Sequence, residues 1–127
     1  MRALVVDDSR SMRTIILKQL KELGFEVYEA ENGQQAMSRL HEVKNIQLVL
    51  LDWNMPEMDG LEVLSLIRAE PAYKDVRVMM VTTESEMSRV ATALEAGASE
   101  YLMKPFDRDA LLEKLILLGL DPSTRTL

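Results

Sequence analysis

The sequence predicts an α/β fold, in which a parallel sheet carries helices on both faces. Five short apolar runs rich in Val, Ile, Leu or Met alternate with segments whose apolar residues recur at helical spacing. Several of the runs lack polar alternation, as strands buried on both faces do. Regular alternation of strand and helix is typical of a parallel sheet with a helix after each strand. The predicted strands are Ala3–Val6, Val27–Ala30, Gln47–Leu51, Val78–Val81 and Tyr101–Met103.

The ends of the predicted helices carry capping and stop signals. Asp59 opens the third helix, because its side chain can cap free N–H groups and Glu62 stands three residues on, in the capping-box position. A helical pattern over Gln34–Val43 follows Asn32-Gly33, so this pair is interpreted as a strand-to-helix loop rather than a hairpin turn. The other stop signals are Gly24, Pro71, Gly97 and Gly119.

Length and composition restrict the class of protein. The 127 residues fit one domain, placed at residues 1–120 and followed by a short polar tail at 121–127. The absence of cysteine excludes disulfides, thiolate metal sites and thiol-based redox sensing. The net charge of −6, from 21 acidic and 15 basic residues, argues against binding to nucleic acid. No apolar run approaches the roughly 20 residues of a membrane span and no signal-peptide pattern is present, so a cytoplasmic protein without membrane contact is expected.

Polar residues follow four of the five predicted strands. In open α/β sheets, ligands bind outside the carboxyl ends of the strands, close to the point where the strand order reverses. We therefore expect these residues to share one edge of the sheet and to form the functional site. They are Asp7-Asp8 after the first strand, Asp52 after the third, Thr82-Thr83 after the fourth and Lys104-Pro105 after the fifth.

The residue types at this edge suit phosphoryl transfer. Three carboxylates should repel one another and raise the pKa of at least one of them. Mg²⁺ relieves such repulsion, because it prefers oxygen ligands and often combines one or two carboxylates with water and phosphate oxygens. Lys104 adds a positive charge for a phosphoryl oxygen, and Thr82 adds a hydroxyl donor. A carboxylate nucleophile, a metal, a lysine and a hydroxyl together are what transfer onto an aspartate requires.

Each of these residues alone also has an ordinary structural interpretation. Asp7 and Asp8 suit the turn and cap before the first helix, and Asp52 suits a loop ahead of two turn formers. Thr82 suits a strand through its β-branch, and Lys104 suits an exposed surface. The coincidence of these weak signals at the ends of the appropriate strands favours the phosphotransfer site.

Several motifs along the chain are shared with one known family. They are Val5–Asp8, Leu51–Gly60, Val81-Thr82, Ala96–Ala98 and Lys104–Phe106. Together they resemble the receiver domain of two-component response regulators, and most closely its chemotaxis regulators, over about residues 2 to 118. The resemblance implies a flavodoxin-like (βα)5 three-layer sandwich with a parallel five-stranded sheet in the order 2-1-3-4-5.

The family's metal and acceptor residues are implied at the matching positions of this chain. Asp52 would be the phosphoacceptor, and Asp8 and Asp52 would bind Mg²⁺ directly, with Mn²⁺ as a substitute. Asp7 would hold the metal through water, and Asn54 would add its backbone carbonyl. No other cofactor is implied.

The resemblance also implies a switch. Thr82 and Lys104 would contact the phosphoryl oxygens, and the Lys104-Pro105 bond would be cis. On phosphorylation Thr82 would swing towards the phosphoryl group and Tyr101 would turn inward. These movements would alter the face made by the fourth helix, the fifth strand and the fifth helix.

Signalling partners, rather than turnover of a separate substrate, are implied by the same resemblance. A histidine kinase's phosphohistidine would be the donor, and slow self-hydrolysis would end the signal. A monomeric regulator would pass the signal to a downstream protein that docks on the altered face, in chemotaxis or motility. The alternative is a receiver-like interaction module, or a phosphorelay intermediate that does not act on the flagellar motor.

The chain departs from the chemotaxis pattern in two places. Thr83 stands where those regulators typically carry alanine, and its larger side chain could hinder attacking water and slow dephosphorylation. The fourth helix is expected to begin at Glu86-Met87, where regulators that bind the flagellar motor typically carry lysines.

Three rival classes explain the sequence less well. A haloacid-dehalogenase-type phosphatase needs a second aspartate two residues after the nucleophile, and Asp52 is followed by Trp53 and Asn54. A flavodoxin-type electron carrier needs a hydroxyl- and glycine-rich phosphate loop after the first strand, where this chain has Asp7–Ser11. Receiver-like domains that take no phosphate usually lose an acidic residue, the acceptor or the lysine, all of which this chain keeps.

Overall fold

One parallel sheet forms the centre of the molecule. Its strands are β1 (Arg2–Val6), β2 (Glu26–Ala30), β3 (Ile46–Asp52), β4 (Arg77–Thr82) and β5 (Glu100–Met103). They are arranged in the order β2-β1-β3-β4-β5, which confirms the prediction. The computed structural model describes residues 1–121 without the side chain of Glu84, so residues 122–127 of the predicted tail lie outside the described part.

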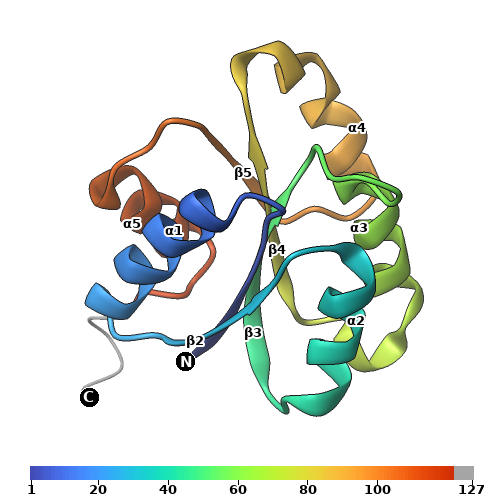
Figure 1. Cartoon of the computed structure of the whole chain (residues 1–127), viewed down its shortest axis with the longest axis horizontal. Helices are drawn as coiled ribbons and strands as arrows, with labels where there is room; N and C mark the ends of the chain where they lie inside the picture. Colours follow the sequence, from blue (N-terminus) through green and yellow to red (C-terminus); the bar gives the residue numbers. More distant parts are fainter. Residues whose placement is uncertain (122–127) are drawn as a thin grey trace.

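Helices cover both faces of the sheet and complete the three predicted layers (Figure 1). On one face lie α1 (Arg10–Glu22) and α5 (Arg108–Leu117), and on the other lie α2 (Gly33–Glu42), α3 (Gly60–Ala69) and α4 (Val90–Glu95). Two short 3₁₀ segments, η1 (Pro71–Tyr73) and η2 (Glu84–Arg89), precede β4 and α4. Within residues 1–121, no helix combines the length and hydropathy that crossing a bilayer requires.

Alternate residues of the central strands pack into two separate cores. In β1, Leu4 and Val6 belong to the cluster formed with α2 and α3, whereas Ala3 and Val5 belong to the cluster formed with α1 and α5. All four are almost fully buried. Burial on both faces explains why these strands are continuous apolar runs without polar alternation.

Local capping places the helix starts where the sequence predicts them. The carboxylate of Asp59 accepts a hydrogen bond of 3.0 Å from the backbone N–H of Glu62, and the Glu62 side chain accepts in return from Asp59. Asn32 caps α2 by accepting from the N–H of Gln35 at 2.8 Å, so Asn32-Gly33 is a strand-to-helix junction and not a hairpin turn. These side chains satisfy N–H groups that would otherwise lack partners.

The start of the fourth helix differs from the prediction. The chain forms the 3₁₀ segment η2 over Glu84–Arg89, and α4 begins only at Val90 rather than at Glu86-Met87. Glu86 is also buried, with 5% of its surface exposed. Its carboxylate turns back to accept from the backbone N–H of Thr83, which favours the tighter turn.

Candidate active site

Three carboxylates converge at the point where the strand order reverses, between β1 and β3. Asp7 directly follows β1, Asp8 comes next, and Asp52 is the last residue of β3. Carboxylate oxygens of the three residues lie within 4.8 Å of one another. Asp7 and Asp52 are 1% and 6% exposed, whereas Asp8 is open to solvent. The cluster therefore has two buried carboxylates and one, that of Asp8, which a ligand can reach from solvent.

Lys104 brings a positive charge to the two buried carboxylates. It directly follows β5, which is separated from β3 by β4. Its ammonium group lies 3.1 Å from Oδ1 of Asp52 and 3.4 Å from Oδ2 of Asp7. The sheet thus assembles the predicted acidic residues and the predicted lysine in one pocket.

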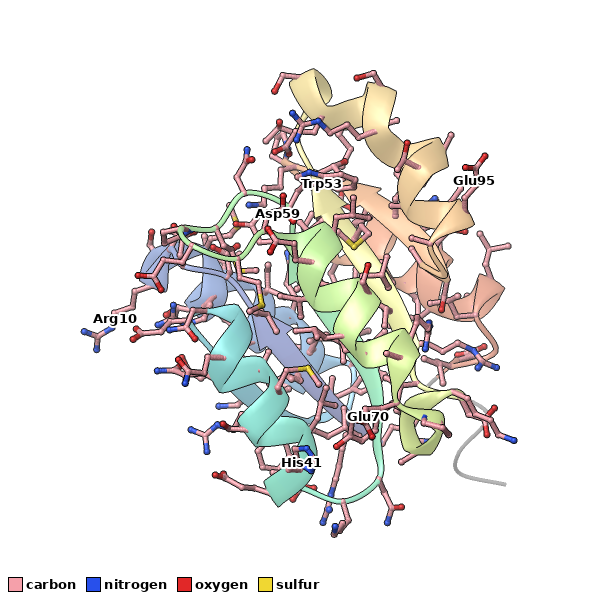
Figure 2. The ribbon with its side chains drawn as sticks, turned by 90° about the vertical axis from the view of Figure 1, so that its right-hand side faces the viewer. Arg10, His41, Trp53, Asp59, Glu70 and Glu95 are labelled. Atoms are coloured by element: carbon pink, nitrogen blue, oxygen red, sulfur yellow. The ribbon has the colours of Figure 1, made fainter. Side chains whose placement is uncertain are left out.

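Figure 2 shows Trp53 and Asp59, which flank the loop after Asp52, at the end of the molecule opposite His41 and Glu70.

The electrostatic balance of the pocket leaves Asp52 hard to ionise. Burial and repulsion by Asp7 raise the pKa of Asp52 from 3.8 to about 6, although Lys104 acts in the opposite direction. Burial alone would lower the pKa of Lys104, but attraction by Asp52 and Asp7 outweighs burial and raises it. The expected repulsion among the carboxylates is therefore present, and it raises the pKa of Asp52.

Asp7 is held at all of its polar atoms. Its N–H donates to the carbonyl of Ala30 at 3.1 Å. Its side chain accepts from the N–H of Ser9 at 2.8 Å and contacts Lys104. Its carbonyl accepts from the buried guanidinium of Arg13 at 2.6 Å, and Arg13 is anchored in turn by Glu29. Arg13 was not identified from the sequence, since nothing there distinguishes it from the other polar residues of α1.

Gly60 allows α3 to begin directly against the end of β3. Its N–H donates to the carbonyl of Trp53 at 2.9 Å. A Cβ at this position would collide with the carbonyl oxygen of Asp52 and would stand 3.0 Å from Cε of Met80. The close approach therefore requires glycine and fixes the backbone that carries Asp52.

Thr82 lies at this edge, and its hydroxyl is bonded to the sulfur of Met87. The side chain is fully buried at the end of β4, and Oγ1 donates to the sulfur of Met87 at 3.7 Å. A thioether sulfur is a weak acceptor, so this contact holds the hydroxyl only lightly. The predicted phosphate contact of Thr82 requires the hydroxyl to leave Met87.

Thr83 and Glu86 form a local network that was not predicted from the sequence. The Glu86 carboxylate accepts from both the N–H and the hydroxyl of Thr83, at 2.8 Å and 3.1 Å. The hydroxyl of Thr83 also lies 2.9 Å from that of Ser85. The spacing Thr83-x-x-Glu86 is the capping-box signature, and it could have been recognised as Asp59-x-x-Glu62 was.

The remaining predicted residues belong to β5 and to the loops that follow β3 and β5. Tyr101 is half-buried on β5, and the ammonium of Lys114 stands 4.2 Å from the centre of its ring. Asn54 lies two residues beyond Asp52, in the loop that leads to α3. The peptide bond between Lys104 and Pro105 is cis.

The donor set suits a hard divalent cation. The cluster of Asp7, Asp8 and Asp52 offers only carboxylate oxygens, with neither imidazole nor thiolate. Oxygen ligands are those that Mg²⁺ and Mn²⁺ prefer. The raised pKa of Asp52 gives an independent reason for the fit, because a bound cation would offset the burial and repulsion that oppose ionisation.

Comparisons with known proteins agree with this geometry. The model of the response regulator receiver domain matches residues 3–116. The chemotaxis protein CheY homolog of Campylobacter jejuni is 47% identical over 116 residues, covering 91% of this chain and 89% of that protein. Chemotaxis protein CheY1 of Helicobacter pylori strain J99 is 45% identical over 121 residues, covering 94% of this chain and 98% of that protein.

Solved structures give the same result. Vibrio cholerae chemotaxis protein CheY4 aligns with a TM-score of 0.85 at 32% identity, covering 92% of this chain and 97% of that chain. The family model spans nearly the whole of the described chain, and the relatives match along almost their full length. The resemblance found in the sequence is thereby confirmed. This chain belongs to the response regulator receiver domain family.

Proposed function

We propose that this protein accepts a phosphoryl group on Asp52 from the phosphohistidine of a histidine kinase, in a Mg²⁺-dependent reaction. The observation that carries the proposal is the convergence of Asp7, Asp8 and Asp52 with Lys104 at the strand-order reversal. This set pairs a carboxylate nucleophile with positive charge for the transferred group. Phosphotransfer is also the role of the receiver family to which the chain belongs.

In the proposed reaction an oxygen of the Asp52 carboxylate attacks phosphorus, and the bond from phosphorus to the kinase's histidine nitrogen breaks. Lys104 is placed to meet a phosphoryl oxygen, because its ammonium already lies 3.1 Å from Asp52. Asp8 and Asp52, with the carbonyl of Asn54 and a water held by Asp7, would bind Mg²⁺. The bound cation would neutralise charge on the transferred group. Mn²⁺ would substitute for it.

We propose that Thr82 and Tyr101 convert phosphorylation into a change of surface. The Thr82 hydroxyl would exchange the weak sulfur acceptor of Met87 for a phosphoryl oxygen, which is a far stronger acceptor. Tyr101 would turn inward beside it and away from Lys114. The face made by α4, β5 and α5 would then bind a downstream protein.

The proposed biological role is signalling in chemotaxis or motility. The names of the Campylobacter, Helicobacter and Vibrio relatives support it. We propose that residues 1–120 form the receiver domain, that the protein acts as a monomer in the cytoplasm, and that it turns over no separate substrate. Neither nucleic acid nor a membrane is a proposed partner.

Labelling with a small phosphoryl donor tests the proposal. The protein is mixed with Mg²⁺ and acetyl phosphate, and its intact mass is recorded. We expect a gain of one phosphoryl group that is lost in Asp52→Asn and in a sample without Mg²⁺. An unlabelled wild type, under conditions that label a known receiver, would contradict the proposal and favour the interaction module.

A second candidate is a phosphorelay intermediate that does not act on the flagellar motor. It is favoured by Glu86 and Met87, which replace the lysines typical of motor binders, and by the burial of Glu86. Binding of the labelled protein to a purified flagellar switch component separates the two roles. Phosphorylation-dependent binding supports the motor role. Its absence, together with phosphoryl transfer from Asp52 to a histidine phosphotransfer protein, supports the relay.

A further inference from the structure

A buried carboxylate that does not belong to the acidic cluster lies in η2. Glu86 is 5% exposed, and its Oε1 accepts two hydrogen bonds from one residue, the N–H and the hydroxyl of Thr83. Its other oxygen, Oε2, is buried and has no hydrogen-bond partner among the described residues. Burying a carboxylate oxygen without a partner is unfavourable. The two hydrogen bonds to Thr83 offset part of this cost at Oε1.

Thr83 stands beside the proposed phosphorylation site. It follows Thr82 at the carboxyl end of β4, and Val81 on the same strand is the register partner of Asp52. The N–H of Trp53 donates to the carbonyl of Val81 at 3.3 Å, which ties the two strand ends together. Thr83 therefore lies two residues beyond the strand position that pairs with Asp52.

The hydroxyl of Thr83 is nevertheless already engaged. It donates to Oε1 of Glu86 at 3.1 Å, because a carboxylate can only accept. With its single proton committed there, the contact of 2.9 Å with Ser85 has the Ser85 hydroxyl as donor. Both bonds join the hydroxyl to the segment 84–89, so its proton and one of its two acceptor lone pairs are directed there.

We propose that Glu86 is a positioning residue that prolongs the phosphorylated state by holding the Thr83 hydroxyl away from the attacking water. This inference rests on the proposed phosphorylation of Asp52. In hydrolysis a water oxygen attacks phosphorus, the bond from phosphorus to the Asp52 oxygen breaks, and inorganic phosphate and a proton are released. A free hydroxyl beside the phosphoryl group would accept a hydrogen bond from that water and orient it. Releasing Thr83 therefore accelerates hydrolysis.

Two substitutions at Glu86 isolate the acceptor. Glu86→Met removes it while keeping an unbranched side chain of similar size in the buried position, and Glu86→Gln keeps a carbonyl oxygen that can accept from Thr83. Each variant is labelled with acetyl phosphate and freed of donor, and the loss of the phosphoryl mass is followed over time. We expect Glu86→Met to lose phosphate about fivefold faster, and Glu86→Gln to stay within about twofold of wild type.

Glu86→Met in a Thr83→Val background shows whether Glu86 acts through the Thr83 hydroxyl or only by stabilising the local structure. Valine keeps the bulk of Thr83 without its hydroxyl, so Thr83→Val should have a near wild-type lifetime and Glu86→Met should add nothing to it. Equal acceleration in both backgrounds, or acceleration in neither, overturns the inference. If thermal melting shows that Glu86→Met is unfolded, Glu86→Ala is measured in both backgrounds by the same criteria. Wild type that takes no label would contradict the proposed function instead.

Discussion

The ammonium group of Lys104 lies 3.1 Å from a carboxylate oxygen of Asp52, although 52 positions separate the two residues in the chain. This contact favours ionised Asp52, yet burial and Asp7 outweigh it and hold the pKa of Asp52 at about 6. A single lysine therefore does not supply all the positive charge that the pocket requires.

Stability of the metal-free protein should fall as pH rises from about 4 to about 6. Asp52 titrates near 3.8 when the chain is unfolded and at about 6 when it is folded. Between these values the unfolded chain binds fewer protons, so the free energy of unfolding decreases with pH and levels off above about 6. The Asp52 contribution is about 3 kcal/mol, since one pKa unit corresponds to about 1.4 kcal/mol. Urea unfolding in a chelator at several pH values measures it.

Asp52→Asn is the matched variant for this titration. An amide does not ionise, so we expect its stability to exceed that of wild type by more at pH 7.5 than at pH 4.5. Asp75→Asn, at an exposed aspartate, controls for removal of a charge. A difference between Asp52→Asn and wild type that is the same at both pH values would contradict the raised pKa.

Mg²⁺ should bind the pocket and stabilise the fold in a pH-dependent way. A ligand that binds only the folded state raises the free energy of unfolding as its concentration exceeds Kd. Because the carboxylates bind the cation in their ionised form, apparent affinity should weaken about tenfold between pH 7 and pH 5. Fluorescence of Trp53, which adjoins Asp52 and is 2% exposed, provides the measurement. Asp8→Asn should weaken binding, and an unchanged affinity in this variant would remove Asp8 from the ligand set.

Thr83→Ala should shorten the lifetime of the phosphorylated state. Loss of the side chain opens a path for water beside Asp52, and a several-fold faster loss of phosphate corresponds to about 1 kcal/mol in activation free energy. Intact mass over time, after removal of acetyl phosphate, gives the rate. A rate equal to that of wild type would show that the bulk of Thr83 does not screen the site.

Gly60→Ala should impair both the fold and the labelling of Asp52. The added methyl group collides with the carbonyl oxygen of Asp52, and overpacking of this kind costs about 1–3 kcal/mol. Gly24→Ala is the control, since a positive φ of 93° makes alanine unfavourable there while no atom lies within 4 Å of the new Cβ. We expect both variants to be less stable in urea, but only Gly60→Ala to label more slowly. Equal labelling rates for the two folded variants would contradict a positioning role for Gly60.

Much of the fold could be predicted because its determinants are local. The unbroken apolar runs around Leu4 and Leu50 indicate strands buried on both faces, and the Asp59 capping box marks the start of α3. The alternation of strand and helix then brings the residues after each strand to one edge. This is why Asp52 and Lys104 could be assigned to one site from sequence and family resemblance.

The fourth helix shows where local reasoning fails. The apolar pattern indicates a helix near Val90, and the Thr83-x-x-Glu86 spacing indicates a cap, but neither reveals that the Glu86 side chain is buried. Whether an acidic residue at such a position faces solvent or the interior depends on the packing of β4 and η2. The predicted start of the helix at Glu86-Met87 is therefore too early.

The sequence by itself determined the order of strands and helices, the caps, and the presence of Asp52 and Lys104 at strand ends, because neighbouring residues encode these features. Only the tertiary structure decided that the Thr82 hydroxyl rests on Met87 and that the pKa of Asp52 is about 6. Hydrogen-bond direction and charge interactions depend on distances of a few ångströms between residues from separate elements. Such distances are set by how the layers pack, and the pattern of a single strand or helix does not contain them.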